Sequence, residues 1–178
     1  MNVSRIHPKL IWLGLALAIA IFSRLIPHAP NWTAIGALAL WGATFFNRRS
    51  LSLVLPLTAL ILTDLALGFH STLVWVYAGF LLVTLVGWIL PADQGAKNWI
   101  TGSLIGSLVF FAVSNFGVWM SGELYPKTLD GLVQCFVMAL PFFENQLGAD
   151  LFFNLFFAAT HVMVFKTSSK LISETVSR

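Results

Sequence analysis

Charged residues are scarce in this chain. Asp, Glu, Lys and Arg make up 10% of its 178 residues, whereas about a quarter is usual for a soluble domain. Hydrophobic residues account for 58%, and the mean hydropathy is +0.85. This balance excludes an ordinary soluble domain. It predicts a single integral membrane domain over residues 1–178, whose immediate partner is the lipid bilayer.

The chain has a single cysteine and lacks the common catalytic motifs. Cys135 is the only cysteine, which excludes an intramolecular disulfide and a metal site built from several cysteines. The phosphate-binding pattern G-x-x-x-x-G-K-[ST], the dinucleotide pattern G-x-G-x-x-G and the zinc pattern H-E-x-x-H do not occur. We therefore expect a protein that is not an enzyme and binds no cofactor or metal. If transport by this protein needs ATP, the ATPase is another chain.

Long apolar runs fill most of the sequence, and a membrane-crossing helix needs about 17–25 such residues. They predict an all-α membrane protein, a bundle of six transmembrane helices. The predicted spans are residues 10–26, 31–46, 51–67, 73–90, 99–119 and 147–165. The second span is the shortest. The longest connection, 120–146, contains an apolar piece over 129–140 that is too short to cross, so we expect a re-entrant or interfacial helix there.

Positive charges fall mainly on one side of these predicted spans. With a cytoplasmic N-terminus, Arg24 and Lys127 lie outside, and the other eight of the ten lysines and arginines lie inside. Lysine and arginine mark cytoplasmic segments. The distribution therefore predicts a multi-pass protein of a bacterial inner membrane with both termini in the cytoplasm. It also explains the net charge of +3 without a nucleic-acid partner. A signal peptide is the alternative for the N-terminus, but cleavage after Ala20 would cut inside the first apolar run.

Polar side chains from several predicted elements share one level near the outer surface. An ionisable group inside a span costs about 2.5–3.5 kcal/mol on insertion scales, so such groups are retained where something uses them. We expect Arg24 to contact at least one of Asp64 and Asp150. One interpretation is a cluster that only holds helices together. The other is an outward-facing pocket that binds an unknown small molecule. The candidate substrate-binding residues are Arg24, His28, Asn31, Asp64, Asn115, Trp119 and Asp150.

The stretch SRLIPHAPNWTAIGALALW, residues 23–41, joins the first two spans. Pro27 and Pro30 are expected to end the first helix and shape a turn that holds His28 and Asn31 over the polar layer. The 120–146 connection mixes aromatic with a few polar residues, as the lid of a small-molecule pocket requires. An interfacial helix has a similar composition. We predict a cavity between the turn and this connection.

Two spacing patterns suggest contacts between helices. Asp150, Asn154 and His161 lie four and seven residues apart on one helical face, which favours an interhelical hydrogen-bond seam over a proton path. Ala16 and Ala20, four apart, make a flat strip that another helix can approach closely. That strip suits either a partner helix or ordinary packing inside the bundle.

Three stretches carry a resemblance to known proteins. They are RLIPHAPNWTAIGALALWGATFF, PLTALILTDLALGF and SNFGVWMSGELYPKTLDGLVQCFVMALPFFENQLGADLFF. From about Arg24 to Phe157 the chain resembles an uncharacterised family of small bacterial integral membrane proteins. More distantly, its plan resembles the substrate-binding components of energy-coupling factor vitamin transporters. That likeness implies a vitamin or micronutrient ligand, separate ATPases, and a membrane coupling protein in contact with Ala16 and Ala20.

Three functions follow from these features. The first is a substrate-binding component of a small-molecule uptake system. The second is a scaffold or assembly subunit without a small ligand, which predicts a filled outer layer. The third is an intramembrane enzyme in which Asp64 and Asp150 share a proton. Arg24 at the same depth would keep both carboxylates ionised, which opposes the third.

Overall fold

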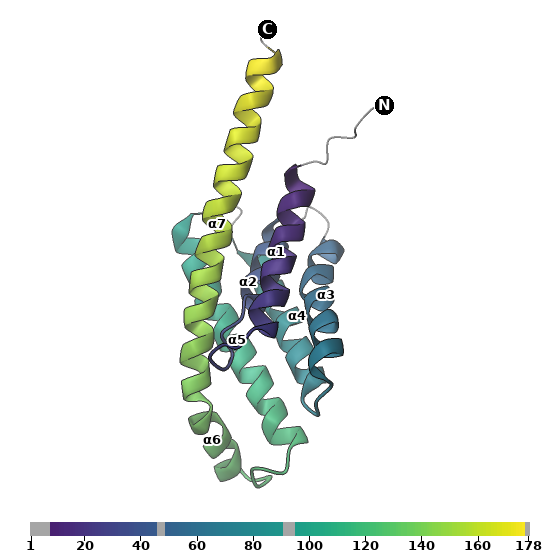
Figure 1. Ribbon diagram of the computed structural model, residues 1–178. Coiled ribbons are helices and arrows are strands. Elements are labelled where there is room, and N and C mark those ends of the chain that lie inside the picture. The colour runs from purple at the N-terminus through teal and green to yellow at the C-terminus, as the bar shows by residue number, and fades with distance from the viewer. Residues whose placement is uncertain (1–7, 46–48, 91–94, 177–178) are drawn as a thin grey trace.

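All regular structure in the described part of the chain is helical. The computed structural model describes residues 8–45, 49–90 and 95–176. Its helices are α1 (Pro8–Leu25), α2 (Ile35–Phe45), α3 (Arg49–Leu67), α4 (Leu73–Ile89), α5 (Ala96–Ser121), α6 (Leu129–Met138) and α7 (Leu140–Val176). The predicted all-α class is confirmed (Figure 1). The N-terminal end of α1 and the C-terminal end of α7 lie at the same end of the bundle.

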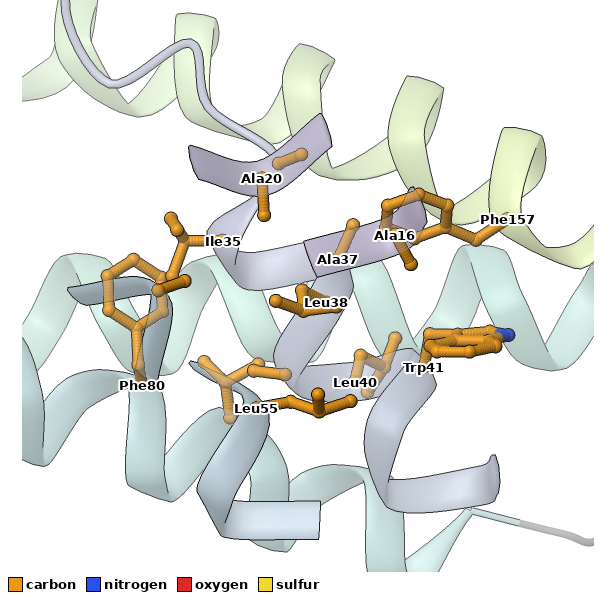
Figure 2. Close-up of a cluster of buried hydrophobic side chains, with 14 of the residues drawn as sticks. Ala16, Ala20, Ile35, Ala37, Leu38, Leu40, Trp41, Leu55, Phe80 and Phe157 are labelled. Atoms are coloured by element: carbon orange, nitrogen blue, oxygen red, sulfur yellow. The ribbon is translucent and has the colours of Figure 1, made fainter. Parts of the chain in front are cut away.

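Helix α2 is the central element of the bundle. It contacts α1, α3, α4, α5 and α7, and every residue from 34 to 43 is buried. Its large side chains Ile35, Leu38 and Trp41 form a core cluster with residues such as Phe157 of α7 (Figure 2). A helix that is apolar on all sides has no solvent-facing stripe, and it is stable only when other helices surround it.

The predicted second span, 31–46, is wrong at its start. Helix α2 begins only at Ile35 and has 11 residues, so it is about 16 Å long. Pro30 lacks a backbone N–H, and Asn31 has a φ of 63°, in the left-handed region. These two residues keep the chain in a turn, so the helix starts later than predicted. Residues 46–48 lie outside the described ranges.

The connection between α1 and α2 is exposed over residues 26–32, but buried residues fasten its two ends to each other. The Ser23 hydroxyl donates to the Ala20 carbonyl oxygen (2.8 Å) and accepts the Ala34 N–H (2.9 Å), which fastens the start of α2 to the last turn of α1. In Figure 1 the end of α5, α6 and the start of α7 extend beyond this connection. Two cavities lie between this connection and the longer helices α5 and α7.

The 120–146 connection is largely helical, which corrects the expected loop. α5 continues to Ser121, and α7 begins at Leu140 instead of 147. Helix α6 matches the expected short helix, and its N-cap Thr128 accepts the Gly131 N–H at 3.2 Å. Pro141 stands in the first turn of α7, where backbone N–H groups have no acceptor within the helix. The proline therefore costs no hydrogen bond there, and it lies at the start of a helix and not at the end of one.

By length and composition, one helix of the described part, α5, could cross a membrane. The shorter apolar helices run to 10–17 residues. The predicted set of six spans is therefore not confirmed by helix length.

Two glycines offer a test of how closely the helices around α2 are packed. A methyl group on Gly87 of α4 would overlap the Cβ of Ala43 and lie 3.0 Å from the Leu40 carbonyl oxygen, whereas a methyl group on Gly14 of α1 would meet nothing within 4 Å. We expect Gly87→Ala to lower the free energy of unfolding by about 1–3 kcal/mol. Gly14→Ala should leave it unchanged or raise it by up to about 1 kcal/mol. Unfolding of the purified variants in detergent measures both, and equal effects would contradict this packing.

Candidate functional site

An ion pair joins α1 to α3. Arg24 Nη2 lies 2.7 Å from Asp64 Oδ1, and Arg24 Nη1 donates to the Thr63 hydroxyl at 2.5 Å. The Tyr77 hydroxyl of α4 donates to Asp64 Oδ2 at 2.9 Å. The Asp64 side chain has no exposed surface, and that of Arg24 is 17% exposed. The prediction that Arg24 contacts at least one of the two aspartates is confirmed, and the partner is Asp64.

Asp150 has a different environment. Its Oδ2 accepts the Ser107 hydroxyl of α5 at 2.7 Å, and the residue is 5% exposed. Gly36 of α2 leaves the space for this carboxylate, because a methyl group there would overlap Oδ1. Within the ranges that the structure describes, no lysine, arginine or histidine forms an ion pair with Asp150. Arg24 therefore does not bridge the two aspartates.

Hydrogen bonds connect α5 and α7 along one line. Asn154 Nδ2 donates to the Ser103 hydroxyl at 2.8 Å, next to the contact between Ser107 and Asp150. The expected interhelical seam is confirmed for Asp150 and Asn154. The side chain of His161, the third member of the predicted stripe, lies outside the described residues.

Two adjoining cavities open beside the α1–α2 turn. The first has a volume of about 340 Å³ and the second about 370 Å³, and Asn31, Val76 and Phe110 line both. The polar lining of the first consists of Arg24, His28, Asn31, Thr33, His70, Gln146 and Asp150. Phe80 and Phe110 add an aromatic wall to it, with ring centroids 4.2 Å apart.

The second cavity is more apolar and lies where the sequence predicts one. The turn contributes Pro30 and Asn31, and the facing wall comes from the α5–α6 loop, α6 and the start of α7. That wall includes Leu124, Tyr125, Cys135, Met138, Ala139 and Phe142. A cavity between the turn and the 120–146 segment, with aromatic residues in its wall, is thus confirmed.

Of the predicted site residues, Arg24, His28, Asn31 and Asp150 meet at the first cavity. His28 is exposed, with ring nitrogens 2.7 Å from the Ala29 and 3.3 Å from the Arg24 carbonyl oxygens, so it also closes the end of α1. Asp64 lies behind Arg24 and is not part of the lining.

Asn115 and Trp119 do not join this group. The Asn115 amide donates to the Phe111 carbonyl oxygen of its own helix (2.8 Å), and the residue lines the second cavity. The Trp119 indole donates to the Pro126 carbonyl oxygen (2.9 Å), and the Lys127 ammonium lies 5.6 Å from the indole ring centre. Trp119 thus fastens the loop after α5 and lines neither cavity, which corrects its expected place in the pocket.

Ala16 and Ala20 face the interior of the bundle. Both are fully buried and belong to the same core cluster as Ile35, Ala37 and Phe157 (Figure 2). Their small side chains let α1 lie close to α2 and α7. This corrects the expected contact with a partner helix, since neither alanine is accessible to one.

Sequence reasoning missed several residues at the site: Gly36, Thr63, His70, Tyr77, Ser107 and Gln146. Tyr77 carries the clearest signal, because it is one of two tyrosines in the chain and lies inside an apolar run. A buried phenol needs a hydrogen-bond partner. Ser107 and Gln146 look like ordinary helical residues until α5 and α7 are placed side by side.

The two buried aspartates of the site have different partners. Arg24 and Tyr77 hold Asp64, whereas Asp150 accepts the Ser107 hydroxyl. Burial raises the pKa of the Cys135 thiol, which disfavours a thiolate nucleophile. Across the described ranges, no group of three or more His, Cys, Asp or Glu side chains could hold a metal ion.

Comparison with known proteins gives one match. The model of a family of unknown function (DUF6580) matches residues 4–171. No curated protein and no solved structure matches the chain. The expected kinship with an uncharacterised family is confirmed, whereas the likeness to substrate-binding components of energy-coupling factor transporters is not shown.

The buried ion pair predicts a strong effect on stability. Arg24→Ala leaves the Asp64 carboxylate buried without its cation, so we expect a loss of about 3–5 kcal/mol in the free energy of unfolding. Adding Asp64→Asn to that variant removes the uncompensated charge and should restore much of the loss. Unfolding in detergent compares the single and double variants. A double variant no more stable than Arg24→Ala would contradict this account.

Proposed function

This chain belongs to DUF6580, a family of unknown function, and we propose that it is a multi-pass inner-membrane protein that captures a small molecule for uptake. The binding site is the pair of cavities beside the α1–α2 turn. The observation that carries this proposal is the meeting of polar side chains, of which Gln146 and Asp150 are buried, and aromatic rings around ligand-sized spaces.

The distribution of polar and apolar side chains supports a membrane location. Large hydrophobic side chains are exposed on every helix except the central α2; examples are Phe22, Leu65, Val74, Leu108, Val133 and Phe152. Asp64, Asp150 and Asn154 are buried instead. A soluble protein rarely exposes apolar surface on this scale. Lipid is the solvent that makes this distribution favourable.

A six-span arrangement is compatible with the short α2. Lipid-exposed irregular backbone is unfavourable in a membrane, but backbone enclosed by protein or lining a cavity is tolerated. The segment before Ile35 lines both cavities, and five helices surround α2. We propose that α1, α2, α3, α4, α5 and α7 are the spans, with α6 at the outer interface and both termini in the cytoplasm.

The cavities favour binding over a purely structural role. Volumes of about 340 and 370 Å³ fall within the range of roughly 300–1,000 Å³ typical of small-molecule sites. A scaffold would be expected to fill this layer with side chains. The mechanism we propose is capture from outside, followed by release inside when a partner deforms the bundle. ATPases on other chains would supply the energy, and the coupling contact lies elsewhere than Ala16 and Ala20.

The proposed topology can be tested by labelling. In a Cys135→Ser background, single cysteines placed within 27–31 or 120–130 should react with a membrane-impermeant maleimide added outside intact cells. Cysteines within 47–50 should react only after the membrane is opened, because the positive charges there mark the cytoplasmic side. Outside labelling at 47–50 would reverse the orientation and the outward-facing site with it.

Ligand binding can be tested by thermal stabilisation of the purified protein. A panel of vitamins and their precursors should contain a compound that raises the melting temperature, since a ligand that binds only the folded state stabilises it. His28→Ala and Asn31→Gly should weaken that rise while the unliganded melting temperature changes little. Glycine suits position 31 because the φ of 63° there strains other residues.

Gly14→Ala is the control for these variants, because position 14 has open space around it. It should respond to the same compound as the unmodified protein. If no compound in the panel stabilises the protein, the scaffold function is preferred.

A further inference from the structure

The first cavity is lined by one amide whose oxygen has no hydrogen-bond donor and by one carboxylate without a cation. Gln146 is 6% exposed, and its Nε2 donates to the Ser107 carbonyl oxygen at 3.4 Å. Its Oε1 is buried without a hydrogen-bond partner. Asp150 lies on the same helix and also lines the cavity. Its carboxylate accepts the Ser107 hydroxyl and neighbours the Gln146 amide, and no cation in the described part of the chain pairs with it. An unsatisfied acceptor and an unpaired acid are costly to bury.

The other charged group at this cavity is already engaged. Arg24 is bound to Asp64 and to Thr63, and the two charges of that pair cancel. His28 and His70 lie at the exposed side, in contact with backbone carbonyl oxygens and with the Thr72 hydroxyl respectively. When Asp64, which lies behind the lining, is counted together with Arg24, an ionised Asp150 leaves the surroundings of the cavity with one negative charge in excess. A ligand of the opposite charge would compensate it.

We propose that the ligand carries a protonated nitrogen, which donates to Asp150 and to Gln146 Oε1 while its apolar part lies against Phe80 and Phe110. This inference rests on the proposed function and names the class of ligand, an organic amine or amidine. An ammonium group has three N–H donors and no acceptor, which complements a site of two acceptors. The tilted pair of phenyl rings at the same cavity offers aromatic surface that attracts a cation.

An inorganic cation fits this site less well. The cavity, at about 340 Å³, is far larger than a bare ion needs. No cluster of three metal-ligating side chains occurs in the described part of the chain. The continuation into the second cavity past Phe110 and Val76 gives room for an extended organic body.

A matched series of probes tests the charge requirement. Phenethylamine, 2-phenylethanol and phenylacetate share a ring and a chain but differ in charge at neutral pH. We expect phenethylamine to stabilise the purified full-length protein in detergent at lower concentrations than the alcohol, and phenylacetate not to stabilise it. Sodium chloride at equal ionic strength serves as the inorganic control. Stabilisation by sodium alone that is lost in Asp150→Asn would overturn the proposal.

Substitutions then locate the interaction. Asp150→Asn keeps the size of the side chain and removes the charge. It should therefore weaken the binding of phenethylamine at least tenfold, so that the amine no longer stabilises the protein at lower concentrations than the alcohol. The unliganded melting temperature should stay the same or rise, because an uncompensated buried charge is gone. Gln146→Met should weaken the binding of phenethylamine by a smaller factor. Asp130→Asn, an exposed acid on α6, is the matched control and should bind like the parent.

The outcomes separate this inference from the proposed function. If a neutral or anionic compound from the vitamin panel stabilises the protein and Asp150→Asn binds it equally well, uptake stands and the amine class is wrong. If Asp150→Asn lowers the unliganded melting temperature and leaves the ranking of the three probes unchanged, Asp150 is structural and the inference is overturned. If neither the amine nor any panel compound stabilises the protein, both fail.

Discussion

One side of the bundle depends on the contacts that the buried Asp64 carboxylate makes. Arg24 brings α1 to it and Tyr77 brings α4, while Asp64 itself belongs to α3. A buried charge is tolerated only when its partners hold it in place. The relative positions of α1, α3 and α4 are therefore set together. Because Arg24 stands in the last turn of α1, the same contact fixes where the α1–α2 turn begins.

A second polar connection, between α5 and α7, complements the first. Ser103 and Ser107 of α5 face Asn154 and Asp150 of α7. Close packing and such hydrogen bonds hold neighbouring apolar helices together. Both connections involve helices that contact α2. Small residues on and around α2, among them Gly36 and Gly87, bring the neighbouring backbones close to it.

The cavities follow from this construction. α2 is short, and the turn before it is fastened to α1 through Ser23, whereas α5 and α7 extend further. The first cavity occupies the space between that turn and the longer helices. Asp150 and Gln146 line it, and the Gln146 amide oxygen has no hydrogen-bond partner. Stability would favour apolar side chains at these positions. Retaining costly polar groups beside an open space is typical of a binding site.

Composition and local pattern were enough to determine the class of this protein. Long apolar runs predict the all-α class and locate most of the helices, because run length depends on the chain alone. The pairing of Arg24 and the cavity beside the Pro27–Asn31 turn also follow from sequence, since a charge in an apolar run needs a partner. Only the tertiary structure decided that the partner is Asp64, that Ala16 and Ala20 face inward, and that Trp119 holds a loop. The physical reason is that a helix apolar on all sides carries no signal for its inward face, so its neighbours choose that face.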